Sequence, residues 1–385
     1  MAMTPTTRYD AAVIGAGVFG AWTAWHLTKR GQRVLLLDAY GPAHSRSSSG
    51  GESRIIRMGY GADELYTRWS QRSLVQWKEL FAATGQPLFH ETGVLWLAAG
   101  GAREKQTVDT LRRCGILHQL LNGAELGQRY PQISCEGVEF AIFEPASGVL
   151  MARRAVAAVV ADARKSGAEY RLAQIVTPHA SGDPREIKTS SGETILADQI
   201  VFACGAWLGK IFPDILGPRI FPTKQEVFFF ATPPGDAGFA PPALPTWLFQ
   251  EDQVYGMPDL ESRGLKIAFD RHGERVDPDT QSRFVSAESA EQARRYVARR
   301  FPALRNAPIV ESRVCQYENT SSGDFLADRH PTLRNIWFVG GGSGHGFKHG
   351  PAMGEYVAGQ ILNDGHAESR FSLATKETVQ RRAVY

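Results

Sequence analysis

Apolar runs alternate along the chain with stretches that carry apolar side chains at helical spacing. The first forty residues show this pattern most clearly. Residues 11–14 and 33–37 form short apolar runs, and the helical stretch between them covers residues 18–30 and stops at Gly31. Continuous apolar strands are typical of a parallel sheet that is covered on both faces. The segment therefore predicts a strand–helix–strand unit.

Later segments predict further helices and strands in an irregular order. Helical spacing indicates helices at 62–84, 151–167 and 289–301. Apolar or alternating runs indicate strands at 93–98, 199–203, 225–232 and 264–270, and a late strand runs into glycines at 335–342. Residues 232–245 are rich in proline and glycine and predict a surface loop.

Three glycines stand between the first predicted strand and its helix, in a GxGxxG pattern. Gly15 permits a tight turn, Gly17 lets a pyrophosphate approach the backbone, and Gly20 lets the helix sit close to the strand. Asp38 ends the second strand, at the spacing where a carboxylate accepts ribose hydroxyls. The unit predicts dinucleotide binding, and the motif does not distinguish NAD from FAD.

The length of 385 residues suits two domains, and the order of the elements indicates that the domains are interleaved. We expect an α/β (α+β overall) fold. A Rossmann-like dinucleotide-binding domain would comprise residues 1–90, 145–220 and 320–385. A substrate-binding domain built on a mostly antiparallel sheet would comprise residues 91–144 and 221–319.

Composition excludes several classes of protein. Hydrophobic content of 43% and charged content of 22% are ordinary, and a net charge of +3 predicts neither a nucleic-acid partner nor a membrane partner. We find no signal-peptide pattern, no apolar run of membrane-spanning length and no metal-ligand spacing. The cysteines are scattered and contain no CxxC pair, which favours a reducing compartment, and we expect a cytoplasmic protein. They are Cys114, Cys135, Cys204 and Cys315.

Motifs along nearly the whole chain resemble those of the glycine/D-amino-acid-oxidase-type flavoproteins. Within them the chain is most similar to the monomeric sarcosine oxidase and N-methyltryptophan oxidase family. The resemblance extends from Asp10 to about Asn363. The motifs are VIGAGVFG, GESRIIRMGYG, TGVLWL, ACGAWLGKIFP, VYGMP, GLKIAFDRHGERVDPDT, VCQYENTSSGDFLADRHP and GGSGHGFKHGPAMGE.

The resemblance implies an FAD-dependent oxidase and a monomer. Its substrates would be a small N-substituted (N-methyl) amino acid such as sarcosine, which carries a secondary amine, and O2. The products would be an imine, which hydrolyses to aldehyde and amine, and hydrogen peroxide. An alternative is oxidation or dehydrogenation of a cyclic imino acid such as pipecolate or proline, of a glycated amino acid, or of another amine. A nucleotide-binding redox sensor without catalysis is a further alternative.

The resemblance also assigns roles to single residues. Cys315 would carry the flavin through a thioether at its 8α position, and the alternative is a buried, inert thiol. Arg57 and Lys348 would hold the substrate carboxylate, and the alternative for Arg57 is a structural ion pair. Arg54 would lie against the flavin ring, or pair with an anion elsewhere. Lys266 would promote the reaction with oxygen, or simply face solvent.

The remaining assignments concern the walls of the site. Tyr255 and Tyr317 would line the substrate pocket, unless they are core tyrosines. His345 would contact flavin or substrate, whereas His349 would be structural or exposed. A helix that opens near Pro351 would direct its positive end at the flavin. The other predicted FAD contacts are Val18, Val176, Cys204, Gly205, Gly342, Gly344 and Gly346.

Two positions depart from the family pattern. Ser49 and Gly50 stand where sarcosine oxidases have a histidine pair, and Asp270 stands where they have another histidine. A carboxylate at Asp270 would attract a more basic substrate amine. We therefore expect oxidation of an amine, and the sequence does not determine which side chain the substrate carries.

Overall fold

The computed structural model describes residues 8–177 and 185–381. The predicted strand–helix–strand unit is present as β1 (Arg8–Ile14), α1 (Val18–Lys29) and β2 (Val34–Asp38). β1 and β2 pair in parallel, with Ala11 opposite Val34. The two apolar runs are thus adjacent parallel strands, as their composition predicted.

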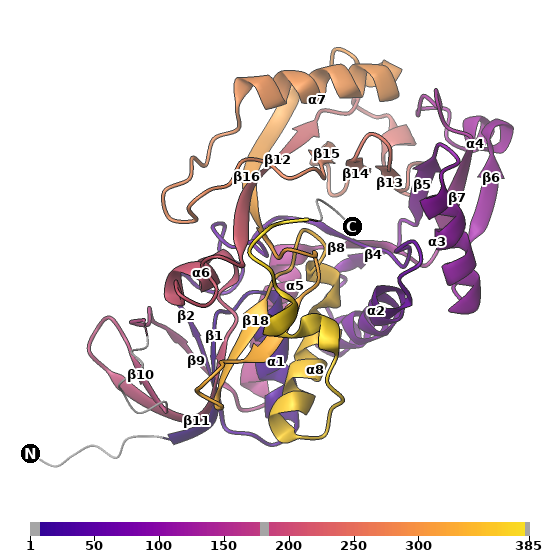
Figure 1. Cartoon of the computed structure of the whole chain (residues 1–385). Helices are drawn as coiled ribbons and strands as arrows, with labels where there is room; N and C mark the ends of the chain where they lie inside the picture. The colour runs from indigo at the N-terminus through magenta and orange to yellow at the C-terminus, as the bar shows by residue number, and fades with distance from the viewer. Residues whose placement is uncertain (1–7, 178–184, 382–385) are drawn as a thin grey trace, which may run out of the picture.

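A seven-stranded sheet contains this unit and forms the lower half of the molecule in Figure 1. Its strand order is β17-β18-β11-β1-β2-β9, and β10 pairs with β11. The central strands are parallel, whereas β10 and β17 add antiparallel edges. The added strands are β9 (Glu169–Leu172), β10 (Glu186–Lys188), β11 (Thr194–Phe202), β17 (Leu326–Arg329) and β18 (Ile336–Gly340).

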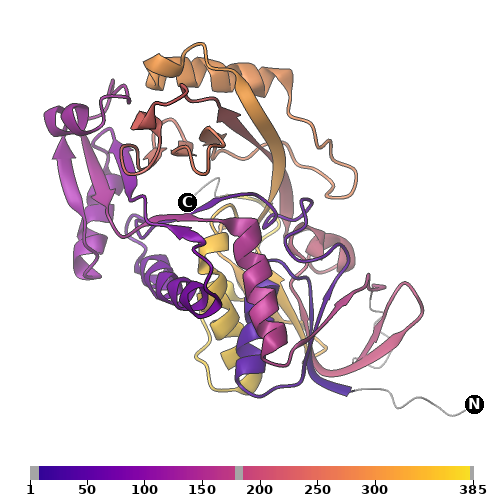
Figure 2. The same cartoon turned by 180° about the vertical axis from the view of Figure 1, so that it is seen from behind.

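Helices cover one face of this sheet. Ala11 and Val13 of β1 belong to a core that also contains residues of α1, α2 (Glu64–Thr84), α5 (Ala152–Lys165) and α8 (Gly350–Leu362). Ala12 and Ile14 point to the opposite face and pack with residues that include those of α6 (Leu208–Ile211). Seen from behind in Figure 2, α5 lies alongside α1.

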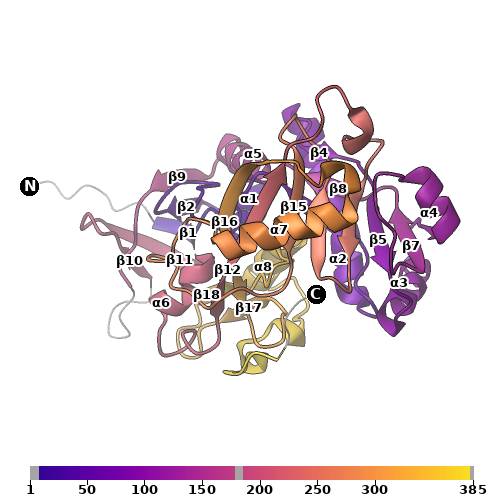
Figure 3. The same cartoon turned by 90° about the horizontal axis from the view of Figure 1, so that it is seen from above.

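An eight-stranded, mostly antiparallel sheet forms the upper half, in the order β16-β12-β15-β14-β13-β5-β7-β6. Its strands are β5 (Val94–Ala98), β6 (Gln119–Asn122), β7 (Phe140–Glu144), β12 (Phe221–Phe230), β13 (Thr246–Phe249), β14 (Val254–Met257), β15 (Leu265–Phe269) and β16 (Ile309–Asn319). Figure 3, the view from above, shows α7 (Ala287–Arg300) lying across this sheet. Two further helices, α3 (Ala102–Arg113) and α4 (Gly123–Arg129), lie beside β5, β6 and β7 in Figure 1.

Three short strands form a small third sheet in the order β3-β8-β4. They are β3 (Arg54–Ile56), β4 (Phe89–His90) and β8 (Gly148–Leu150). Both large sheets contain strands from distant parts of the chain. One sheet is mostly parallel and covered by helices and the other is mostly antiparallel, so the fold has the predicted mixed α/β character. The division of the chain into two domains at the boundaries given above stays a prediction.

Several elements differ from their sequence-based bounds. β11 and β12 begin five and four residues earlier than predicted, and α3 and β16 were not predicted at all. β16 alternates charged with apolar residues and is only partly buried over its first half, so its apolar signal is weak. Residues 232–245 form a loop with one short helical turn, anchored by the buried side chains of Phe239 and Leu244.

No helix in the described ranges combines the length and the apolar character that crossing a membrane requires.

Candidate active site

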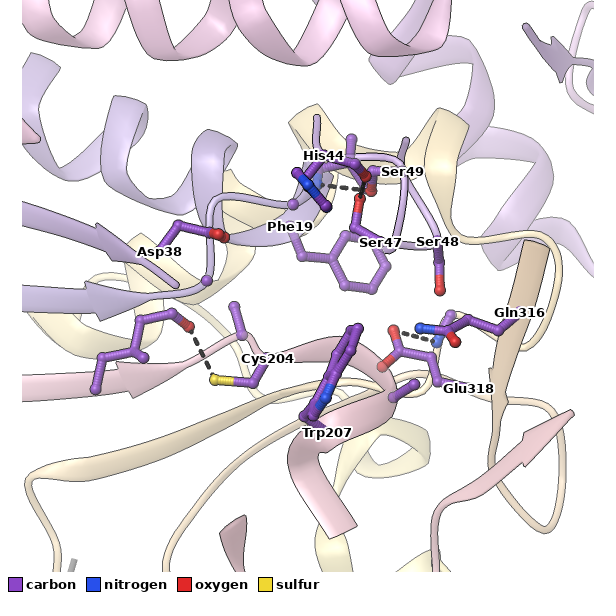
Figure 4. A pocket seen from close by; sticks show the side chains of 18 of the residues that line it. Phe19, Asp38, His44, Ser47, Ser48, Ser49, Cys204, Trp207, Gln316 and Glu318 are labelled. Carbon is purple, nitrogen blue, oxygen red and sulfur yellow. Dashed lines mark hydrogen bonds between the residues drawn. The ribbon is translucent and has the colours of Figure 1, made fainter. Parts of the chain in front are cut away.

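A long cavity lies where the parallel strands of the seven-stranded sheet end at their carboxyl termini. Its empty volume is about 1700 Å3, part of it open to solvent. Figure 4 shows side chains from α1, from the loop after β2, from the segment after β11 and from β16 facing this space. This edge of a parallel sheet is the general place for a nucleotide in such folds.

The glycine motif forms one end of the cavity. Gly15 has a positive φ of 105°, and a β-carbon there would lie 2.4 Å from the carbonyl oxygen of Ala203. A β-carbon at Gly20 would lie 1.9 Å from the carbonyl oxygen of Gly15, so the helix packs directly on the turn. Gly17 precedes the first turn of α1 and lines the cavity. The turn, close approach and helix contact that the motif requires are all present.

Asp38 lines the same cavity at the end of β2. Its Oδ2 accepts a hydrogen bond from the backbone nitrogen of Ala16 at 2.7 Å, and its Oδ1 accepts from Tyr40 and Gly41 at 2.8 Å. A carboxylate has about four acceptor positions. Asp38 therefore ties the glycine turn to β2 and keeps acceptor capacity toward a ligand.

Ser49 and Gly50, which depart from the family pattern, fit closely into the backbone beside the long cavity. Ser49 accepts a hydrogen bond from the backbone nitrogen of Val18 at 3.0 Å, so its hydroxyl satisfies a donor at the start of α1. A β-carbon at Gly50 would lie 2.0 Å from the carbonyl oxygen of His44. This backbone has no room for a histidine at position 50.

Most of the predicted FAD contacts line the long cavity. They are Gly15, Gly17, Val18, Asp38, Arg54, Cys204, Gly205, Gly342, Gly344 and Gly346. Gly20 lies behind the turn, and Val176 is 44% exposed and does not line the cavity, although Ile175 and Thr177 do. Cys315 is half-buried beside Gln316, which does line it. His345 and Lys348 line the adjoining cavity.

Sequence reasoning missed Gln316 and Glu318 on β16, although the quoted motif contains both. Gln316 is 1% exposed and Glu318 is 8% exposed, and both line the long cavity. Burial raises the pKa of Glu318 to about 7. A glutamate amid other polar residues gives no signal of burial in one sequence, because only the pairing of β16 with β12 turns it inward.

A smaller cavity of about 530 Å3 adjoins the first and brings most of the predicted catalytic residues together. The two share Arg54, Ser343, Gly344 and Phe347. The predicted residues that line the smaller one are Arg54, Arg57, Tyr255, His345 and Lys348, and Asp270 joins them. Amino acids that lie up to 294 positions apart, Arg54 and Lys348, thus meet at one site.

Two buried cations face this smaller cavity. Arg57 is 6% exposed, donates to the carbonyl oxygen of Gly59, and stacks on the rings of Tyr60 and Trp96. Lys348 is 4% exposed, and its Nζ donates to the carbonyl oxygen of His345 at 3.0 Å. Burial lowers the pKa of Lys348 well below its ordinary value, and the charge of Arg57 lowers it further. An entering carboxylate would relieve both effects.

Asp270 supplies the opposite charge at the same cavity. Its Oδ1 accepts a hydrogen bond from the hydroxyl of Tyr317 at 3.2 Å. Burial raises the pKa of Asp270, and the charge of Arg57 opposes this shift. Burial also raises the pKa of Tyr255 to about 12. Tyr255 lines the smaller cavity and Tyr317 lines the long one, and both lie close to Asp270. Their roles at the substrate stay a prediction.

Lys266 lies on β15, under the segment that carries Arg54. Its Nζ donates to the carbonyl oxygen of Ser53 at 2.9 Å and to the Ser53 hydroxyl at 3.0 Å. The residue is only 3% exposed, so the alternative of an outward lysine is wrong. Burial lowers the pKa of Lys266 well below its ordinary value, and the charge of Arg54 adds to the shift. Lys266 does not line either of the two cavities.

His345 and His349 share one partner. The hydroxyl of Tyr60 lies 3.2 Å from Nδ1 of His345 and 2.8 Å from Nε2 of His349. His345 lines the smaller cavity, whereas His349 is completely buried. The alternative that His349 is exposed is therefore wrong. His349 is structural, since its contact with Tyr60 links it to His345.

An outer chamber continues the smaller cavity and was not predicted. Its volume is about 1110 Å3, and it shares Leu248, Tyr255 and Asp270 with the smaller cavity. Charged and polar side chains, including those of Arg103 and Glu104, line it. Both come from α3, which the sequence pattern did not predict. In the described ranges, no three side chains of histidine, cysteine, aspartate or glutamate gather as a metal site.

The fold and the joined cavities define a dinucleotide-binding enzyme. A family model described as FAD dependent oxidoreductase (DAO) matches residues 10–360. The chain belongs to this DAO family of FAD-dependent oxidoreductases. Its members act on amines and amino acids, so FAD as the cofactor and the predicted class of enzyme are confirmed. Covalent attachment of the flavin stays a prediction.

Named relatives agree with the resemblance seen in the motifs. The chain is 31% identical to a monomeric sarcosine oxidase from Bacillus sp. (strain NS-129), over 98% of this chain and 100% of that one. It is 28% identical to an N-methyl-L-tryptophan oxidase from Salmonella heidelberg (strain SL476), over 91% and 94%. An L-proline dehydrogenase from P. horikoshii has the same fold, with a TM-score of 0.83, 22% identity and coverage of 96% and 97%.

Proposed function

We propose that the enzyme oxidises the secondary amine of an N-substituted amino acid, with oxygen as the electron acceptor. The observation that carries the proposal is the pair of buried cations, Arg57 and Lys348, at a cavity that opens into the dinucleotide cavity. Two fixed cations bind a carboxylate well, because arginine offers two parallel donors and lysine a point charge. The names of the sarcosine oxidase relatives support the same chemistry.

When bound, FAD accepts the electrons of the amine C–H bond and passes them to oxygen, giving an imine and hydrogen peroxide. Arg57 and Lys348 would hold the substrate carboxylate and orient the amine. Tyr255 and Tyr317 would exclude water and hold the Asp270 carboxyl in place. His345 would support Lys348 through its carbonyl oxygen, which accepts the hydrogen bond from Nζ.

Two further residues would act on the cofactor side. We propose that Cys315 carries a covalent flavin, because its sulfur accepts a hydrogen bond from Arg54, which lines the long cavity. We propose that Lys266 stabilises the negative charge that develops on oxygen, since a fixed cation acts without reorganisation. Neither role changes the residues that bind the substrate.

The residues around the substrate side chain suggest a second candidate class of substrate. Asp270 and the outer chamber would admit an amine with a larger polar or basic substituent than the methyl group of sarcosine. This favours a bulkier N-methyl amino acid or a glycated amino acid over sarcosine. A cyclic imino acid such as pipecolate or proline would use the same carboxylate clamp.

An amine panel tests the proposal. The purified enzyme is mixed without oxygen with sarcosine, larger N-methyl amino acids, pipecolate, proline and a glycated amino acid, and loss of the visible flavin absorbance is recorded. Admission of air should restore the absorbance and yield one hydrogen peroxide per amine oxidised. Bleaching without peroxide would indicate another electron acceptor. A flavin that no amine bleaches would refute the proposal and favour a redox sensor.

We also propose a monomer in the cytoplasm. The relatives described as monomeric support the first part. Four scattered free cysteines support a reducing compartment. Size-exclusion chromatography with light scattering tests the oligomeric state, and cell fractionation tests the location.

A further inference from the structure

Glu318 has a buried oxygen for which the described residues provide no hydrogen-bond donor. The residue lies on β16 and is 8% exposed. Its Oε1 accepts a hydrogen bond from the backbone nitrogen of Gly342 at 3.3 Å, whereas its Oε2 has no partner. Figure 4 shows the carboxylate directed into the long cavity, toward the space that Phe19 and Trp207 also face.

Such an oxygen is unfavourable unless a ligand or an ordered water supplies the donor. A buried acceptor without a partner loses its hydration and gains nothing in return, and the loss is larger when the group is charged. Burial raises the pKa of Glu318 to about 7, because the ionised form loses its hydration in the cavity wall. A donor in the cavity would stabilise that ionised form.

Two glycines lie close to the buried oxygen of Glu318. A β-carbon at Gly205 would lie 3.4 Å from Oε2, and one at Gly340 would lie 3.3 Å from it. Gly205 follows β11 and Gly340 ends β18. Of the two glycines, Gly205 lines the long cavity, so a larger side chain there would crowd this oxygen on the cavity side.

The strand order shows which part of a dinucleotide would reach this oxygen. Asp38 marks the end of β2, the glycine turn follows β1, and Glu318 lies beside the ends of the next two strands, β11 and β18. The turn and the start of α1 suit the pyrophosphate, because their backbone donors and helix dipole favour an anion. A carboxylate would repel the pyrophosphate and suits a hydroxyl group. In FAD, the hydroxyl-bearing ribityl chain lies between the pyrophosphate and the flavin ring.

We propose that Oε2 of Glu318 accepts a hydrogen bond from a ribityl hydroxyl of bound FAD. Glu318 is then a cofactor-binding residue that contacts the flavin half of the dinucleotide. The inference depends on the FAD dependence of the family and not on the amine that the enzyme oxidises.

Binding measurements on apoprotein test this inference without any turnover. The wild-type sequence and its variants are compared in a Cys315→Ala background, expressed under riboflavin limitation, so that binding is reversible. FAD and ADP are titrated by calorimetry, because ADP contains the adenosine and pyrophosphate of FAD but no ribityl chain. The variants are Glu318→Ala and Glu318→Gln. Glu311→Gln, at the outer part of the same strand, is the matched control.

Glu318→Ala should raise the Kd for FAD about 10-fold or more and leave the Kd for ADP unchanged, because a charge-assisted hydrogen bond is lost only for the flavin half. Glu318→Gln keeps an acceptor without the charge and should show a smaller increase. Glu311→Gln should bind both ligands like the parent.

A ribityl-deoxygenated FAD series identifies the hydroxyl. The parent should bind one of the 2′-, 3′- and 4′-deoxy analogues more weakly than FAD, whereas Glu318→Ala should bind that analogue and FAD equally. Unchanged FAD binding in Glu318→Ala would refute the inference and indicate that Oε2 binds a water instead. Equal losses for FAD and ADP would also refute it, since they would show a purely structural role. Circular dichroism checks that each variant is folded.

Discussion

Nη2 of Arg54 donates a hydrogen bond to Sγ of Cys315 at 3.3 Å, although the two residues lie 261 positions apart in the chain. The same guanidinium group also donates to the carbonyl oxygen of Ser48 at 2.7 Å, which fixes it at the edge of the long cavity. The contact holds the Cys315 sulfur beside a residue that lines the long cavity.

The first prediction concerns covalent attachment of the flavin. After acid precipitation, the wild-type pellet should be yellow, and the Cys315→Ala pellet should be colourless because the sulfur of the proposed thioether is gone. Cys204→Ala is the matched control and should keep a yellow pellet, because burial raises the pKa of the Cys204 thiol and disfavours its thiolate. A Cys315→Ala pellet as yellow as wild type would place the linkage elsewhere.

The second prediction concerns the carboxylate clamp. Arg57→Met and Lys348→Met should each raise KM for sarcosine or the best N-methyl amino acid about 10- to 100-fold, as expected for a lost charge-assisted hydrogen bond of ~1.5–3 kcal/mol. Steady-state peroxide assays measure the change. Methionine preserves much of the packing of Arg57 on Tyr60 and Trp96.

Two controls make this experiment specific. The exposed Lys105→Met variant should behave like wild type. The carboxamide of the same substrate should show little difference between the wild type and the clamp variants. Unchanged kinetics in both clamp variants would rule out the clamp.

The third prediction concerns the reaction with oxygen. Lys266→Met should lower the second-order rate constant for reoxidation by oxygen at least about 10-fold, because the fixed cation is lost, and leave anaerobic reduction nearly unchanged. Stopped-flow absorbance separates the two half-reactions. Burial lowers the pKa of Lys266, so the wild-type oxygen rate should fall as pH rises through that lowered pKa, and the variant should not show this decline. A slow reductive half-reaction with normal reoxidation would assign Lys266 to substrate oxidation instead.

The fourth prediction concerns substrate preference at Asp270. The wild type should prefer Nα-methyl-lysine over Nα-methyl-norleucine, because the carboxylate attracts the distal cation. Asp270→Asn should reduce the ratio of the two kcat/KM values about 10-fold, and asparagine can still accept the hydrogen bond from Tyr317. The exposed Asp109→Asn variant is the control. An identical ratio in all three proteins would show that Asp270 does not select the side chain.

The fifth prediction concerns stability against pH. Burial raises the folded-state pKa of Asp270 above its unfolded value, so the folded protein retains the proton more strongly. The resulting stabilisation is fully present below the unfolded pKa of about 4 and is lost as pH rises through the folded pKa. Denaturant unfolding should therefore show Asp270→Asn gaining stability relative to wild type as pH rises from about 4 to 8. If the difference in unfolding free energy between Asp270→Asn and wild type does not vary with pH, burial does not perturb this carboxyl.

The family motifs allowed much of the site to be predicted. GxGxxG favours one backbone geometry, whereas the lysines in GLKIAF and SGHGFK were assigned from the family resemblance alone. The structure brings Arg54, Arg57 and Lys348 to one cavity and leaves Lys266 outside it. The long helices and central strands were also predicted, because their apolar periodicity is strong. Glu318, Gln316 and Glu104 were missed, since a polar residue carries no sign of burial until its neighbours are known.

The sequence by itself determined the strand–helix–strand unit, the glycine turn and the residue types that an amine oxidase of this family needs, because these depend on local backbone preferences and on motifs a few residues long. Only the tertiary structure decided that Asp270 meets Arg57 and Lys348, that Gly50 has no room for a side chain, and that an outer chamber continues the site. The pairing of β12 with β15 and β16 joins segments far apart in the chain. Which side chains such pairing buries together depends on the whole packed sheet, so no short stretch of sequence specifies it.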